Sequence, residues 1–172
     1  MADTSIVVDA SEIQALIKQY PQYADIIEEE MSRAMTGSLE IFKGQVVSRT
    51  PVGATGEARQ SIGTLVRGRP PTFEGGVFIT VPYGLPLERG RAAGRPPPTG
   101  PIQLWVERKL GLSGQEAEQA AFLIARAIGR RGTQGAKMFE KGFDGGKEPA
   151  LKLWNSVPDR SLDRIERKIN KI

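Results

Sequence analysis

The chain has 172 residues, a usual size for one domain, and its 39% hydrophobic and 26% charged residues are typical of a globular protein. It contains 0 His and 0 Cys, which excludes disulfides, thiolate nucleophiles, zinc fingers, imidazole bases and any Ser-His-Asp triad. Carboxylate pairs, Ser-Lys chemistry and oxygen-bound metals are still allowed. We find no apolar run of the ~18 residues that span a membrane and no secretory signal, so we expect assembly in a cytoplasm.

Charge is unevenly distributed along the chain, which has a net charge of +4. Residues 1–50 carry 4 basic and 8 acidic side chains, residues 51–105 carry 6 and 3, and residues 106–172 carry 14 and 9. Such a distribution favours head-to-tail contacts between copies, because the acidic part of one copy can meet the basic part of the next. A solvated surface of mixed charge is the alternative interpretation.

We expect one domain over residues 1–172, in which residues 1–20 are an arm or short helix, residues 21–157 the core and residues 158–172 a helical extension. A short helix is predicted over residues 11–20. Apolar residues at spacings of three and four then predict a long amphipathic helix from Pro21 to about residue 49. Its apolar stripe consists of Ile27, Met31, Ala34, Met35, Leu39, Phe42 and Val46.

Two runs rich in β-branched and aromatic residues, residues 61–66 and 76–81, predict a β-hairpin around the stretch RGRPPTFEGG. Val77, Ile79 and Val81 form one apolar face of the second run, which we expect to pack on the long helix. Because two strands alone are marginally stable, we expect further strands from the same chain or a neighbouring copy to complete the sheet.

Frequent Gly and Pro in residues 84–100 predict a long loop, which is a candidate for partner contact or, alternatively, a disordered linker. A helix is predicted over residues 101–110, ended by Gly111. Another begins near Ser113, which has capping-box spacing to Glu116. The face of this second helix that we expect to be buried consists of Ala117, Ala120, Ala121, Ile124, Ala127 and Ile128.

The C-terminal part predicts two more helices after a Gly-rich stretch, beginning at Pro149 and near Pro158. The apolar seam of the last one consists of Leu162, Ile165, Ile169 and Ile172. The predicted fold class is therefore α+β: a long amphipathic helix on a small, mainly antiparallel sheet, with further helices in the C-terminal half and a long Pro/Gly/Arg-rich loop.

The sequence contains no clear set of catalytic residues. The stretch FDGGKE around Lys147 resembles part of a phosphate-binding loop, but Glu148 stands where a hydroxyl must bind magnesium. Consecutive Glu28, Glu29 and Glu30 point in different directions on a helix and are expected to be solvated. Acidic and basic residues alternate over residues 159–167 and are expected to form exposed ion pairs. We therefore expect neither an enzyme nor a cofactor or metal site.

Arginine-rich loops suggest contact with DNA. Arg67 and Arg69 lie in the sequence RGRP, which is similar to the core of an AT-hook. Arg89, Arg91 and Arg95 lie in a similar but less regular arrangement of Arg, Gly and Pro. Contact with phosphates, without reading of base sequence, is the simpler interpretation. A small basic DNA-binding module that uses these loops is therefore the alternative function.

The segment TPVGATGEARQSI, residues 50–62, resembles a motif of the tail-completion, or neck, proteins of long-tailed bacteriophages. The matching residues are Pro51, Val52, Thr55, Gly56, Arg59, Ser61 and Ile62. One additional residue precedes Thr55, and Ala58 stands where the family usually has Leu. Tyr83, Glu88 and Gly90 are similar to the family's tyrosine followed by glutamate-x-glycine.

Two later stretches, residues 102–111 and 121–139, look like a subgroup of this family with a Trp-bearing helix, a helix ending in Arg-Arg-Gly-Thr and a Met-Phe segment. The resemblance covers roughly residues 25–155.

This resemblance implies a structural virion protein. Members form a ring, commonly of six copies, in the neck between head connector and tail tube, where the ring completes the tail and lets DNA pass. The implied partners are further copies, the head connector or stopper protein, and the tail tube or terminator protein.

In a neck protein we expect Glu88, Arg89, Arg91 and Arg95 to lie in a docking or lumen-facing loop. Charge reversal at Arg91 and Arg95 should then impair the joining of head and tail and leave the fold intact.

Overall fold

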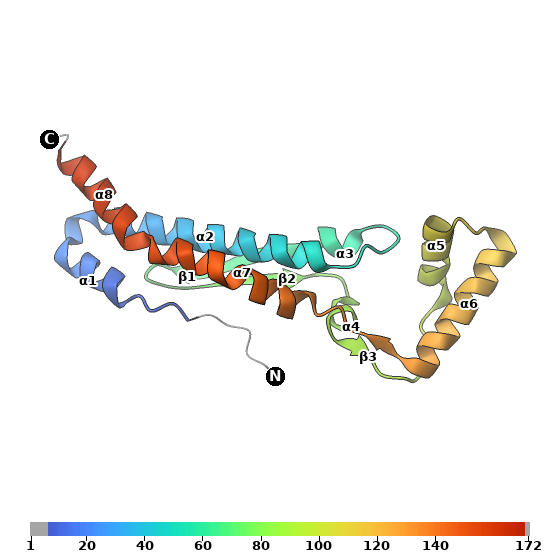
Figure 1. Ribbon diagram of the computed structural model, residues 1–172. Coiled ribbons are helices and arrows are strands. Elements are labelled where there is room, and N and C mark those ends of the chain that lie inside the picture. Colours follow the sequence, from blue (N-terminus) through green and yellow to red (C-terminus); the bar gives the residue numbers. More distant parts are fainter. Residues whose placement is uncertain (1–6, 171–172) are drawn as a thin grey trace. The chain divides into compact units, whose positions relative to one another are not determined.

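The computed structural model describes residues 7–170, and the chain forms two compact units (Figure 1). The first unit contains residues 1–48, 63–78 and 139–172, and the second contains residues 49–62 and 79–138. Helices predominate, together with a two-stranded antiparallel sheet and more helices in the C-terminal half, which confirms the predicted α+β class.

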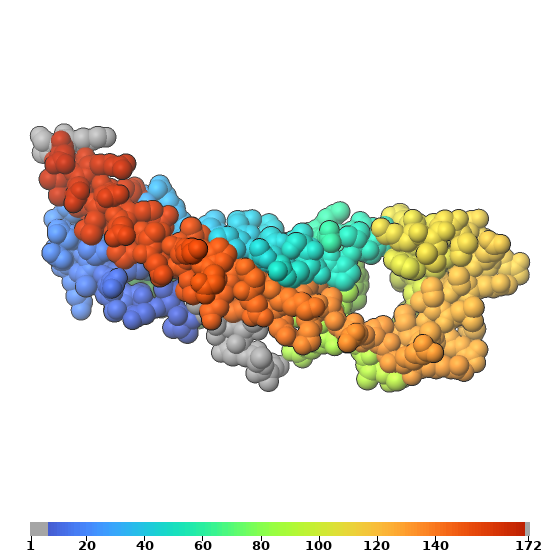
Figure 2. All heavy atoms as spheres, viewed as in Figure 1, coloured from blue at the N-terminus to red at the C-terminus, as the bar shows by residue number. Residues whose placement is uncertain are grey.

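The first unit is built on one long helix. Its elements are α1 (Ser11–Gln19), the 3-10 turn η1 (Pro21–Tyr23), α2 (Ala24–Arg49), β1 (Ile62–Arg69), β2 (Thr72–Ile79), α7 (Met138–Asn155) and α8 (Val157–Ile169). Figures 1 and 2 show α7 running beside α2, with the hairpin behind both helices in Figure 1. The predicted stripe of α2 does face the interior, since Ile27, Met31 and Ala34 are buried. They form a core with Ile13 of α1, Trp154 of α7, and Val157 and Ile165 of α8.

Three glycines allow α7 to lie unusually close to α2. A Cβ on Gly142 would come within 3.0 Å of the Val46 backbone nitrogen, and one on Gly146 would lie 2.6 Å from the Phe42 ring. On the facing helix, a Cβ at Gly37 would lie 2.9 Å from Leu153. The two helices therefore pack this closely because these three positions carry no side chain.

The same contact corrects our prediction for the C-terminal part. We expected a helix only from Pro149, but α7 begins at Met138, and Pro149 lies inside it. Each interior glycine costs a helix about 1 kcal/mol in propensity, which is why the sequence pattern missed these turns. Packing against α2 offsets that cost. The FDGGKE stretch is consequently helical and forms no phosphate-binding loop.

A buried carboxylate joins α8 to α2. Glu30 is 2% exposed, and its Oε1 atom accepts hydrogen bonds from Arg33 Nη1 at 2.9 Å and Arg164 Nη1 at 2.8 Å. Arg160 Nε lies 3.4 Å from Glu30 Oε2. Arg164 also donates to Glu29 Oε2 at 2.7 Å, and this hydrogen bond lowers the pKa of the exposed Glu29 carboxyl.

Two predictions about these charges are wrong. Glu30 is not solvated, and Arg160 and Arg164 pair with α2 rather than with neighbours on their own helix. The predicted seam of α8 is also shifted. Val157, Ser161 and Ile165 are its buried residues, whereas Ile169 is 47% exposed and Ile172 lies outside the described residues. Spacing within one helix could not reveal which charges a second helix would bury.

The predicted hairpin is confirmed, but its strands are longer than expected. β1 and β2 extend into the RGRPPTFEGG stretch, so that Arg67 and Arg69 belong to β1 and the turn lies at Pro70 and Pro71. The inner face of β2 meets the helices, since Gly75 lies against Met35 and Leu39 of α2. Within residues 7–170, no third strand joins this sheet.

The second unit is mostly helical. It contains α3 (Glu57–Gln60), α4 (Gly84–Arg89), β3 (Gly90–Arg91), α5 (Thr99–Leu110), α6 (Gly114–Arg131) and β4 (Thr133–Gln134). The expected loop over residues 84–100 is therefore confined to residues 92–98, because α4 and β3 occupy its first half. The helix at residue 113 is confirmed without its capping box, since the Ser113 side chain makes no capping hydrogen bond.

The buried face of α6 is narrower than predicted. Ala117, Ala121, Ala125 and Gly129 are buried at every fourth position, while Ala127 is exposed. Small residues at this spacing let another segment approach the helix backbone, and a Cβ on Gly129 would lie 3.1 Å from the Gly94 carbonyl oxygen.

Replacing Glu30 by Gln should destabilise the protein. The neutral amide keeps one hydrogen-bond acceptor but leaves several arginines without their buried countercharge, which we expect to cost about 2 kcal/mol. Glu28→Gln, at an exposed position two residues away on the same helix, is the control and should change stability by less than about 0.5 kcal/mol. Chemical denaturation measures both. Equal effects of the two changes would contradict the role of Glu30.

Replacing Gly142 by Ala should also destabilise the protein, although alanine is the better helix former. The added methyl group would meet Val46 and force α7 away from α2, at a cost of about 1–3 kcal/mol. Gly44→Ala on α2 is the matched control: nothing lies within 4 Å of its Cβ, so it should stabilise the helix by about 1 kcal/mol. Opposite shifts of the thermal midpoint are expected. A stabilised Gly142→Ala variant would refute the close contact.

Candidate assembly surface

The motif of residues 50–62 forms one tightly bonded turn in the second unit. Thr50 is fully buried, and its carbonyl oxygen accepts a hydrogen bond of 2.7 Å from Arg59 Nε. Gly56 precedes α3 with a φ of 71°, a left-handed conformation that favours glycine. Ala58 and Ile62 are buried beneath the turn. Gly56, Arg59 and Ile62, three of the residues that match the family motif, thus each have a structural role in this chain.

The turn is also bonded to later parts of the same unit. Arg108 Nη1 of α5 donates to the carbonyl oxygen of Ala54 at 3.2 Å. The hydroxyl of Tyr83, just before α4, donates to Glu57 Oε2 at 3.3 Å. Burial, and next the Glu57 carboxylate, raise the pKa of Tyr83. These two hydrogen bonds connect the turn to α5 and to the residue that precedes α4.

The four candidate residues Glu88, Arg89, Arg91 and Arg95 lie in residues 84–98, which we name the strap: α4, β3 and the loop of residues 92–98. Glu88 and Arg89 belong to α4 and Arg91 to β3, and only Arg95 lies in the loop. β3 pairs antiparallel with β4, Gly90 opposite Gln134 and Arg91 opposite Thr133. The backbone nitrogen of Lys137 donates to the Glu88 carbonyl oxygen at 3.0 Å. Gly90, Gly132 and Gly135 lie so close to facing backbone that no side chain fits at these positions.

The arginines of this strap have different surroundings. Arg91 is half-buried, and its Nη2 atom donates to the Arg95 carbonyl oxygen at 2.7 Å, so Arg91 holds the loop of residues 92–98. Arg89 and Arg95 are exposed. Charge reversal at Arg91 would consequently disturb the loop itself, whereas Arg89 and Arg95 are free to meet a partner.

Arg67 and Arg69 belong to the other unit and lie on β1, with both residues exposed. The glycine between them faces β2, since a Cβ on Gly68 would come within 2.8 Å of the Thr72 carbonyl oxygen. An AT-hook enters the minor groove as a free extended segment. Here the backbone of Arg67 and Arg69 is instead part of a hairpin, so the segment differs in structure from an AT-hook.

Sequence reasoning missed an apolar surface on α5 and α6. Leu110, Phe122 and Leu123 are each more than half exposed, and Leu104 and Trp105 are 36% exposed. Gln115, Glu118 and Gln119 of the same helix border Phe122 and Leu123. The sequence did contain a signal for this surface. Phe122 and Leu123 lie on the face of α6 opposite the alanines, where a solvated helix would carry polar residues.

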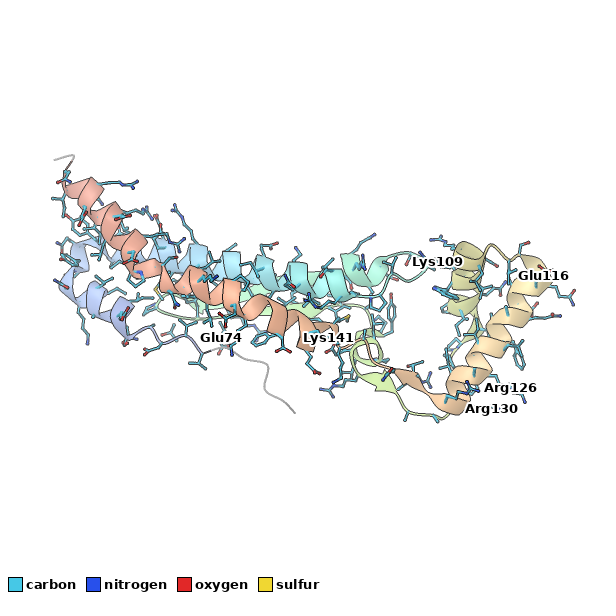
Figure 3. The ribbon with its side chains drawn as sticks, viewed as in Figure 1. Glu74, Lys109, Glu116, Arg126, Arg130 and Lys141 are labelled. Carbon is cyan, nitrogen blue, oxygen red and sulfur yellow. The ribbon has the colours of Figure 1, made fainter. Side chains whose placement is uncertain are left out.

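Basic residues continue this surface toward the C-terminal end of α6. Figure 3 shows Arg126 and Arg130 close together there, one helical turn apart. With Phe122 they form a row at every fourth position. We name the exposed Phe122, Leu123, Arg126 and Arg130 side chains the α6 surface. It combines apolar area with positive charge, a composition suited to binding another macromolecule.

Nothing in residues 7–170 brings together three or more metal-ligating side chains. None of the helices in this range is long and apolar enough to cross a membrane. Comparison of the chain with family models, with curated proteins and with solved structures finds no match.

Tyr83 provides a pH test of the turn. Its raised pKa means that the folded protein holds the phenolic proton more tightly than the unfolded chain does. This contribution to stability is complete below the unfolded pKa and is lost as pH rises through the folded pKa. With Tyr20 and Tyr23 changed to Phe, an ultraviolet titration should find Tyr83 titrating above its ordinary range.

Glu57→Gln should then lower the pKa of Tyr83 only in part, because burial is the larger cause of the shift. Glu116→Gln, at an exposed position on α6, is the control and should leave the titration unchanged. A Tyr83 that titrates normally, or that is insensitive to Glu57→Gln, would contradict the hydrogen bond described for the turn.

Proposed function

We propose that this protein is a structural subunit of the neck of a long-tailed phage. Copies of it form a ring, in which six is the expected number, and the ring completes the tail and joins it to the head connector while DNA passes through. The motif of residues 50–62 suggests this function. The structural observation that supports it best is the partition of charge between the two units.

The second unit is basic, with 11 basic and 5 acidic residues, whereas the first contains 13 basic and 15 acidic residues. The second unit therefore has a net charge of +6, against −2 for the first unit. A subunit of this kind suits head-to-tail repetition, because the basic unit of one copy is attracted to the acidic unit of the next. Such contacts generate a closed ring when the rotation between copies closes.

The α6 surface supports an assembly role as well. Phe122 is 57% and Leu123 is 61% exposed. Large adjacent apolar side chains on a monomer usually mark an interaction site, because their burial on association removes apolar area from water. In the proposed ring this surface contacts a neighbouring copy or the adjoining stopper or tail protein. Arg89 and Arg95 meet the connector or the passing DNA.

A small basic DNA-binding module is the second candidate, favoured by the exposed Arg67 and Arg69 on the hairpin. The two functions differ in their behaviour toward free DNA. A binding module binds free duplex tightly, with an affinity that falls steeply as salt rises. A neck subunit binds free duplex weakly and acts only with its viral partners.

Charge reversal at both Arg89 and Arg95 should impair the joining of heads and tails. Both side chains are exposed, and the hydrogen bond from Arg91 uses the backbone carbonyl of Arg95, so the variant should keep its thermal midpoint. We expect at least about a ten-fold loss of infectious particles, the effect of about 1.4 kcal/mol at the contact. The assay is complementation of a phage that lacks the protein, followed by electron microscopy.

Lys109→Glu, another exposed basic position in the second unit, is the matched control and should complement normally. If the Arg89 and Arg95 variant joined heads to tails normally, these two residues would have no role in the proposed contact. Equal loss with Lys109→Glu would show that total charge, rather than this site, matters.

A further inference from the structure

Charges on α8 are divided between two faces of the helix. Arg160 and Arg164 reach the buried carboxylate of α2. Asp159, Asp163 and Glu166 are exposed, and their spacings of four and three residues place them in one row on the face opposite the buried residues of α8. In the part of the chain that the structure describes, none of these three carboxylates forms an ion pair. α8 therefore presents a row of uncompensated negative charge.

An exposed apolar side chain lies at the C-terminal end of this row. Ile169 follows Glu166 by three residues and is 47% exposed. We name Asp159, Asp163, Glu166 and Ile169 the α8 surface. Its burial would remove apolar area from water and bring the carboxylates close to whatever covers it, so a partner must supply both apolar contact and positive charge.

The α6 surface has this complementary composition. Phe122 and Leu123 precede both of its arginines along the chain, and neither arginine forms an ion pair within residues 7–170. Figure 3 shows Arg126 and Arg130 at the opposite end of α6 from Glu116. On α8 the order is reversed, since the charged residues precede the apolar one. Apolar therefore meets apolar, and acid meets base, only when the two helices are antiparallel.

The spacings along the two helices agree as well. With a rise of about 1.5 Å per residue, Arg126 and Arg130 lie about 6 and 12 Å from Phe122 along the axis of α6. By the same rise, the three carboxylates of the α8 surface lie about 4.5, 9 and 15 Å from Ile169. When Phe122 is placed opposite Ile169 in antiparallel helices, each arginine falls between two carboxylates. Both charge and position therefore match.

We propose that the α6 surface of one copy packs antiparallel against the α8 surface of a second copy. The two surfaces differ, so the contact is heterologous, and each copy uses both surfaces to extend a head-to-tail row or ring. α6 belongs to the unit with a net charge of +6 and α8 to the unit with −2, which favours the same pairing. The inference rests on the proposed function for its premise that copies assemble, and it names the partner of the α6 surface.

Disulfide formation between single-cysteine chains tests the pairing, because the protein has 0 Cys. Phe122→Cys chains are mixed with Ile169→Cys chains of different mass and mildly oxidised. Docking raises the effective concentration of the two thiols, so the mixed dimer should exceed either homodimer by at least about ten-fold. Leu65→Cys, at an exposed apolar position of β1, replaces Phe122→Cys in the control and should give no such excess.

Three outcomes of this experiment would overturn the proposal. An excess of Phe122→Cys homodimer would mean that two α6 helices meet symmetrically. A statistical mixture of dimers would mean that neither surface recognises the other. In a chain that carries both cysteines, a monomeric disulfide would mean that the two surfaces meet within one copy.

Exchange of charges tests the ionic part of the same contact. Arg126→Glu with Arg130→Glu, or Asp163→Lys with Glu166→Lys, should weaken self-association at least about ten-fold in sedimentation velocity, because like charges then face each other. A mixture of these two reversed chains should associate again, since every α6 surface finds a complementary α8 surface on the other chain. Failure of the mixture to associate would overturn the proposal.

Lys141→Glu with Lys147→Glu, at two exposed positions of α7, changes the total charge equally and is the control. It should associate as the unchanged chain does, and an equal loss would overturn the role of the two surfaces. The contact and the neck function fail separately. Chains that stay monomeric in both experiments would overturn the contact alone, whereas phage that join without the protein would contradict the neck function alone.

Discussion

The close approach of α7 to α2 is the contact on which the first unit depends. Gly142 lies against the backbone of Val46, and Gly37 and Gly146 leave room for the Leu153 and Phe42 side chains of the facing helix. This contact orders a Gly-rich stretch that has poor helix propensity by itself, and it sets the position of Trp154, against which the hairpin residue Phe73 packs. α8 follows directly from α7, so the same contact brings Arg160 and Arg164 to the buried Glu30. Core, hairpin and ionic cluster therefore share one geometric origin.

Much of the fold follows from local patterns in the sequence. The three-and-four spacing of Ile27, Met31 and Ala34 predicts α2 and its buried face, and the β-branched runs predict the hairpin. Features that depend on tertiary contact are not predictable in this way. α7 forms through packing at glycines, and Glu30 is buried by a helix more than a hundred residues later. The α4–β3 strap, misread as a loop, depends on pairing with Thr133 and Gln134.

In the candidate site, too, the residues could be identified from the sequence but their tertiary contacts could not. Arg67, Arg69, Arg89, Arg91 and Arg95 could be chosen from the sequence as basic residues among Gly and Pro, but their roles could not. Arg91 bonds to the Arg95 carbonyl, while Arg89 and Arg95 are exposed. The α6 surface was not predictable from the alanine spacing, because that spacing indicates only the face that the helix buries. The second unit thus combines these exposed groups with a concentration of positive charge.

The most direct test of the neck proposal is electron microscopy of a lysate from a phage that carries this gene with an early nonsense codon. The proposal predicts DNA-filled heads beside separate tails, because a missing ring leaves each half complete but unjoined. Restoring the protein from a plasmid should restore joined particles. Intact, infectious virions without the protein would contradict the proposal and leave the DNA-binding module as the function to pursue.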